Sequence, residues 1–140
     1  MQFYSTNRKT SPVSLREAVV RGLATDRGLF MPEVIRRFPP AFYQNMKEMT
    51  LREISFVVAE AFFGENVEAG KLKEIVDETL NFDIPLVQVA DNRYSLELFH
   101  GPTLAFKDVG ARFMARLLAY FNKQEGERQV NVLVATSGDT

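Results

Sequence analysis

The chain has 140 residues, of which 46% are hydrophobic and 25% charged, as in folded domains rather than disordered or fibrous chains. Its 17 basic and 18 acidic residues give a formal net charge of −1, so neither nucleic acid nor an anionic membrane surface is expected as a partner. The lack of cysteine and the single histidine exclude disulfides and thiolate or histidine-rich metal sites, and no apolar run approaches the roughly 20 residues of a membrane span, so we expect a cytoplasmic protein without a metal.

The first predicted helix follows a short polar segment. Ser14 and Glu17 form a capping-box pattern, and apolar residues then recur at helical spacing as far as about Ala24. Residues 26–28, Asp-Arg-Gly, predict a turn. Residues 29–32, LFMP, predict a short apolar stretch that the proline ends.

Two further amphipathic helices are predicted before residue 84. Thr50 and Glu53 repeat the capping-box pattern ahead of a run with one apolar face, which Gly64 closes. The next helix has Glu68 near the positive end of its dipole. Its buried side is predicted to carry Leu72, Ile75, Val76 and Thr79.

The pattern changes near residue 84, where strands become the better prediction. Residues 86–90 and 94–99 flank the turn dipeptide Asp-Asn and predict a β-hairpin. A loop at residues 100–103 leads into a helix whose apolar face is formed by Gly110, Phe113, Met114, Leu117, Leu118 and Phe121. Residues 130–135, VNVLVA, then predict a strand that is buried on both faces, so strand, helix and strand form a parallel βαβ unit.

The predicted organisation is a helical N-terminal region, residues 1–84, followed by an α/β region, residues 85–140. The second region offers too few strands to complete a sheet, so it is interpreted as incomplete. Because no following helix covers the strand at residues 130–135, we expect one of two outcomes. Either the chain self-associates through this segment, by strand pairing or by exchange of the last helix and strand, or its last residues are disordered.

The first residues that indicate chemistry lie between the hairpin and the last helix. Lys107 is predicted at a helix start, where the dipole disfavours an ammonium ion and residues 104–106 add apolar surroundings. A neutral amine can attack an aldehyde and later serve as a general base. The alternative is a surface lysine whose charge is balanced by Asp108. His100 is interpreted as a loop histidine bonded to backbone rather than as a catalyst.

A second candidate segment follows the predicted strand at residues 130–135. The hydroxyls of Ser137 and Thr140 and the amide of Gly138 suit a carboxylate, because ligands collect beyond the carboxyl ends of strands in open α/β sheets. The alternative is a plain helix cap, since Ser, Asp and Thr are what helix N-termini favour. Taken alone, these residues leave both interpretations open.

Three motifs together resemble one family. Residues 98–108 read LFHGPTLAFKD, residues 135–140 read ATSGDT, and residues 28–32 read GLFMP. In this combination they resemble the threonine synthase family, whose Gly-Leu-Phe-x-Pro signature the third motif matches. Residues 7–10, NRKT, depart from the Ser-Thr-Arg-Gly type of signature in many members, which leaves any role for their two basic residues open.

This resemblance implies fold type II of the pyridoxal-phosphate (PLP) enzymes, the tryptophan synthase β-like fold with a parallel sheet. It implies that Lys107 is the catalytic lysine that holds PLP as a Schiff base. It further implies that the substrate carboxylate is received by Ser137, Gly138, Asp139 and Thr140. Asp139 would also approach the cofactor ring, and the relatives that make cysteine carry Asn at that position, which favours threonine synthase.

The implied reaction converts O-phospho-L-homoserine and water to L-threonine and phosphate. The resemblance also implies that the glycine-rich loop for the cofactor phosphate and the partner of the pyridine nitrogen come from later sequence. The chain is therefore interpreted as an N-terminal fragment that is inactive alone. The alternatives are a non-catalytic, threonine-synthase-like protein that binds a phosphorylated metabolite and a truncated product with no function beyond folding.

Overall fold

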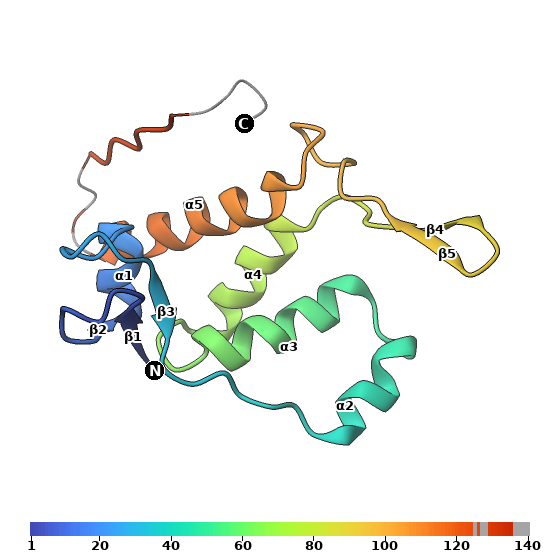
Figure 1. Ribbon diagram of the computed structural model, residues 1–140, viewed down its shortest axis with the longest axis horizontal. Helices are drawn as coiled ribbons and strands as arrows, with labels where there is room; N and C mark the ends of the chain where they lie inside the picture. Colours follow the sequence, from blue (N-terminus) through green and yellow to red (C-terminus); the bar gives the residue numbers. More distant parts are fainter. Residues whose placement is uncertain (125, 127–128, 136–140) are drawn as a thin grey trace. The chain divides into compact units, whose positions relative to one another are not determined.

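The computed structural model describes residues 1–124, 126 and 129–135 (Figure 1). The chain divides into two compact units, Met1–Val76 and Asp77–Thr140. The division falls inside a helix, α4 (Ala69–Thr79), rather than in a loop. The predicted boundary near residue 84 rests on a change of sequence pattern and stays a prediction.

The first unit contains a small antiparallel sheet that the sequence did not predict. Its strands are β1 (Gln2–Ser5), β2 (Val13–Ser14) and β3 (Phe30–Pro32), in the order β2-β1-β3. The central strand pairs with both neighbours, so Phe3 lies opposite a residue on each side and its ring is buried. The N-terminal region is therefore mixed α/β rather than simply helical.

The first helix, α1 (Leu15–Arg21), begins as predicted and ends earlier. The Ser14 hydroxyl accepts a hydrogen bond from the Glu17 amide at 3.2 Å, which caps the helix start. The helix ends where Gly22 adopts a φ of 70°, a conformation that glycine reaches without a side-chain clash. The helix therefore ends at Arg21, about one turn before the predicted end near Ala24.

The remaining helices of this unit follow their capping signals. Helix α3 (Leu51–Phe63) has the complete capping box between Thr50 and Glu53. Two amides at the start of α4 donate to the Glu68 carboxylate, which lowers its pKa. The four predicted inward residues of α4 are all buried. The exceptions are a short helix, α2 (Pro40–Asn45), and the 3₁₀ turn η1 (Met46–Glu48), which have no side-chain cap and were not predicted.

The core of the first unit joins the sheet to the helices. Its buried apolar side chains come from β1, α1, α3 and α4 and from the connections between them: Phe3, Leu15, Ala18, Ala24, Ala59, Val67, Leu72, Ile75 and Val76. Figure 1 shows α1 beside the three short strands, and α1 contacts both β1 and β2. These contacts bury the sheet on the side of α1.

The second unit consists of a hairpin, a loop and a long helix. The hairpin strands are β4 (Leu86–Ala90) and β5 (Arg93–Leu96), and the turn residue Asn92 has a φ of 56°, as a tight turn requires. The predicted hairpin is confirmed, although β5 ends at Leu96. Eight of the nine strand residues are exposed, in keeping with the arm that Figure 1 shows.

Helix α5 (Lys107–Gln124) is attached to the end of α4 by two arginines. Arg112 Nη2 donates to the Glu78 carbonyl at 2.7 Å and to Asn81 Oδ1 at 3.0 Å. Arg116 Nε donates to the Glu78 carboxylate at 2.7 Å. Leu80, Leu117 and Phe121 are buried in this unit. Arg112 therefore supplies a partner for one of the carbonyls that the C-terminal end of α4 leaves unsatisfied, and Arg116 adds an ion pair at the same residue.

The strand predicted at residues 130–135 does not form, and this is a correction. Residues 129–135 have no helix or strand assignment, and Val130, Val132, Leu133 and Val134 are exposed. A strand needs a neighbour to accept its backbone hydrogen bonds, and the hairpin strands of the described chain pair only with each other. The parallel βαβ unit is consequently absent from the described residues.

A polar network closes the turn between α1 and β3. The Asp26 carboxylate accepts hydrogen bonds from the Ser5 hydroxyl at 2.6 Å and from the amides of Lys9 and Gly28, each at 3.0 Å. These bonds, with Ser5 first, hold the pKa of Asp26 below its ordinary value. A Cβ on Gly28 would lie 2.0 Å from the Ser5 hydroxyl oxygen, so this position requires glycine. The network ties the loop after β1 to the loop before β3.

Asp26 should make the stability of the protein pH-dependent. Because its pKa is lower in the folded state, its contribution is present above the ordinary value near 3.8 and is lost as pH falls through the folded pKa. We expect Asp26→Asn to lower the melting temperature near neutral pH and the difference from the parent chain to shrink below about pH 4. Thermal unfolding from pH 3 to 7 checks this.

The control is Glu60→Gln, which changes an exposed carboxyl on α3 of the same unit. Its melting temperature should follow the parent chain over the whole range. A pH profile of Asp26→Asn that runs parallel to the parent profile would contradict the role of this carboxylate.

Candidate functional site

The loop between β5 and α5 begins with a contact to the base of the hairpin and two contacts within the loop. The Glu97 amide donates to the Pro85 carbonyl at 3.0 Å, which extends the pairing at the base of the hairpin. His100 Nε2 lies 2.6 Å from Glu97 Oε2, and its ring stacks on Phe99 with 4.7 Å between centroids. The sequence suggested a backbone partner for His100, and the structure places a carboxylate there instead.

Asp108 anchors the rest of this loop. Its carboxylate is buried and accepts a hydrogen bond from the Thr103 amide at 2.8 Å. A Cβ on Gly101 would lie 2.5 Å from Asp108 Oδ2, so the chain can approach the carboxylate only because residue 101 has no side chain. The Leu104 amide then donates to the Gly101 carbonyl at 3.0 Å, with Leu104 at a φ of 57°.

The anchoring role of Asp108 was missed in the sequence. There it was considered only as a charge that balances the neighbouring lysine. The available signal was its place at the second residue of α5, five residues after Thr103, because an acidic side chain in the first turn of a helix commonly accepts loop or helix amides.

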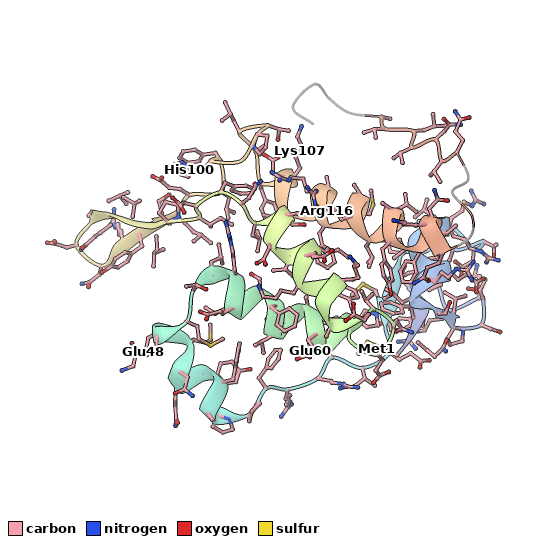
Figure 2. The ribbon with its side chains drawn as sticks, turned by 180° about the vertical axis from the view of Figure 1, so that it is seen from behind. Met1, Glu48, Glu60, His100, Lys107 and Arg116 are labelled. Carbon is pink, nitrogen blue, oxygen red and sulfur yellow. The ribbon has the colours of Figure 1, made fainter. Side chains whose placement is uncertain are left out.

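Lys107 is the first residue of α5, as predicted, and is half-buried. Figure 2 shows its side chain at the start of the helix, with His100 on the loop that precedes it. The expected apolar burial is not found, since Leu104 is 74% and Phe106 66% exposed. The apolar side chains that precede Lys107 in the sequence therefore offer open surface rather than a closed pocket.

The second candidate segment cannot be placed. Ser137, Gly138, Asp139 and Thr140 lie outside the described residues. Among the residues that are described, no three His, Cys, Asp or Glu side chains gather as a metal site would require. The helices in the described part of the chain also include none that is long and apolar enough to cross a bilayer.

Solved structures resemble this mixed α/β fold. The X-ray structure of PLP-bound threonine synthase from Brucella melitensis matches with a TM-score of 0.86 and 34% identity, over 91% of this chain and 29% of that one. The threonine synthase of Escherichia coli matches with a TM-score of 0.81 and 36% identity, over 86% of this chain and 28% of that one.

Comparison of sequences gives the same family. A threonine synthase from Serratia marcescens is 40% identical over 140 residues, which are all of this chain and 32% of that protein. The one from Escherichia coli is 37% identical with the same coverage. This chain thus spans about a third of the length of these relatives. The family model described as threonine synthase N terminus matches residues 2–80, more than half of the chain, and the chain therefore belongs to that family.

Proposed function

We propose that the chain carries part of the active site of a PLP-dependent threonine synthase, a lyase that converts O-phospho-L-homoserine and water to L-threonine and phosphate. The observation that carries this proposal is the position of Lys107 at the start of α5, beside a loop that the buried Asp108 anchors. The family membership and the PLP-bound relative support it.

The residues near Lys107 suit PLP chemically. Lys107 is a half-buried residue with a primary amine, and the preceding apolar residues Leu104 and Phe106 are exposed, so their side chains can cover one part of a planar aromatic ring. When bound, PLP supplies an aldehyde that reacts with an amine and a ring that takes up the electrons released at the substrate α carbon. We propose that Lys107 holds the cofactor at Nζ.

The task of Lys107 during turnover is to move protons. In its neutral form, Nζ can take the proton from the α carbon of the substrate and exchange protons at the β carbon, while phosphate leaves from the γ carbon and water adds at the β carbon. We propose that Ser137, Gly138, Asp139 and Thr140 receive the substrate carboxylate, with Asp139 also facing the cofactor ring. Hydroxyls and backbone amides of this kind are good carboxylate donors.

The proposal also covers the fold of residues 130–135 and the cellular location of the protein. We infer that residues 130–135 become a strand of the parallel, fold-type-II sheet when a neighbouring strand is available, which their apolar sequence and exposure support. A cytoplasmic location is also proposed, supported by the absence of cysteine from the sequence.

Attachment of the cofactor can be tested without measuring turnover. The longest form of the protein that contains residues 1–140 is incubated with PLP, reduced with borohydride, digested and mapped by mass spectrometry. We expect the label on Lys107 and its loss in Lys107→Arg, because a guanidinium stays protonated and cannot attack the aldehyde. Lys123→Arg, at the other end of α5, is the control and should keep the label. Label on Lys123, or undiminished label in Lys107→Arg, would refute the assignment.

The loop anchor is tested with two glycines of the same segment. Gly101→Ala places a Cβ 2.5 Å from Asp108 Oδ2, so the loop must move away from the helix. We expect a lower melting temperature and faster hydrogen exchange at the Thr103 amide. Gly110→Ala is the control, because its Cβ meets nothing within 4 Å and the change inside α5 should stabilise the helix by about 1 kcal/mol. Equal protection of Thr103 in both variants would count against the anchor.

Self-association through residues 130–135 remains a proposal about the isolated 140-residue chain. Val132 and Val134 are exposed, and an unpaired apolar segment can pair with a second copy. We expect sedimentation velocity to show a dimer fraction that rises with concentration and is lost in Val132→Lys. The control, Val20→Lys, changes a valine of α1 with similar exposure and should leave association unchanged. A monomer at every concentration would contradict the proposal.

A further inference from the structure

Two neighbouring pockets lie in the first unit, and Thr10 and Pro12 line both. One has a volume of about 370 Å³ and is lined by Tyr4, Arg8, Thr10, Pro12 and Glu33. The other has a volume of about 310 Å³, and its lining includes Glu17 and Arg21. Each pocket therefore contains one arginine and one glutamate.

The charges of the two pockets differ in how they are satisfied. In the smaller pocket, Arg21 Nη2 lies 2.9 Å from Glu17 Oε1, so these groups form an ion pair with each other. In the larger pocket, the Arg8 guanidinium contacts an aromatic ring, and no ion pair to Arg8 or Glu33 occurs within the described part of the chain. The larger pocket thus presents an unpaired cation and an unpaired anion.

Thr10 adds an unsatisfied polar group at the wall that the pockets share. Its hydroxyl oxygen is buried and has no hydrogen-bond partner among the described residues. Leaving a buried hydroxyl without a partner is costly, so such a group calls for an explanation. Because Thr10 lines the larger pocket and its hydroxyl can rotate between staggered positions, it is a candidate partner for a ligand there.

Arg8 is held in place before any ligand arrives. Its φ is 54°, a conformation that is unfavourable for a residue with a side chain. Its amide donates to the Ser5 carbonyl at 2.9 Å, and the next amide, of Lys9, donates to Asp26. Its guanidinium carbon lies 4.4 Å from the centre of the Tyr4 ring. The network that closes the turn before β3 therefore holds the backbone around Arg8, and the contact with Tyr4 positions its guanidinium.

We propose that the larger pocket binds a small zwitterionic amino acid. Its carboxylate would pair with Arg8, its ammonium group with Glu33, and the Thr10 hydroxyl would complete the contacts. Two unpaired charges of opposite sign on one pocket suit a ligand that carries both charges on a small frame, and a 370 Å³ pocket has room for it. The site uses residues of the first unit alone and does not rest on the function proposed for Lys107.

The test is an NMR titration of the ¹⁵N-labelled 140-residue chain with L-serine, which carries both charges and a hydroxyl. We expect saturable shifts of the Arg8, Thr10 and Glu33 amides. Acetate and methylamine, each carrying one of the two charges, should bind at least about tenfold more weakly, because each forgoes one charge-assisted contact. If acetate shifts the same amides with the same affinity as L-serine, the pocket is a site for anions and not for zwitterions.

Variants with matched controls test the contacts. Arg8→Gln and Glu33→Gln should each weaken L-serine binding about tenfold or more. Arg27→Gln changes another exposed arginine with positive φ, 66°, in the same unit, and Glu60→Gln changes an exposed glutamate, so both should bind as the parent chain does. If Arg27→Gln weakens binding as much as Arg8→Gln, the proposed contact is wrong.

Thr10→Val separates binding from folding. Removing an unsatisfied buried hydroxyl should leave the melting temperature unchanged or raise it, while L-serine binding falls about threefold to tenfold. A variant that is destabilised and binds normally would show that the hydroxyl has a structural partner and no role in binding. Absence of saturable shifts with L-serine in the folded parent chain would overturn the site itself.

Discussion

The buried carboxylate of Asp108 holds the loop that precedes Lys107 against the start of α5. It accepts the Thr103 amide, and it fills the space that a side chain at residue 101 would occupy. It also stands in the first turn of α5, where a negative charge interacts favourably with the helix dipole. One side chain therefore joins loop and helix. The place of the adjacent amine follows from this contact, because Lys107 precedes Asp108 at the start of the helix.

The first unit contains a comparable contact between a carboxylate and loop amides. Asp26 accepts a hydroxyl and two amides, and Gly28 approaches so closely that any side chain would collide with Ser5. In both units a carboxylate gathers loop amides while a neighbouring glycine allows the chain to come near. The glycines of the Gly-Leu-Phe and His-Gly-Pro motifs are thus required because the backbone lies close to a polar side chain at each of them.

Features whose signal lies within a few residues could be predicted from the sequence. The capping box of Thr50 and Glu53 and the hairpin turn at Asn92 are examples, as is the position of Lys107 at a helix start. The strands β1 to β3 could not, because two to four residues show little periodicity and pair with distant partners. The apolar run at residues 130–135 was predicted as a strand and does not form one, since a strand requires a neighbour as well as a suitable sequence. Asp108 was underestimated because its contacts exist only in three dimensions.

Helix α4 has a consequence for how the molecule folds. The division between the units falls inside this helix, so its eleven residues belong partly to each. Starting a helix is the unfavourable step, and adding residues to an existing one is comparatively easy. Once the first unit has ordered the N-terminal turns of α4, the turns that belong to the second unit need no nucleus of their own. The N-terminal turns of α4 thereby lower the cost of ordering its last residues, which belong to the second unit.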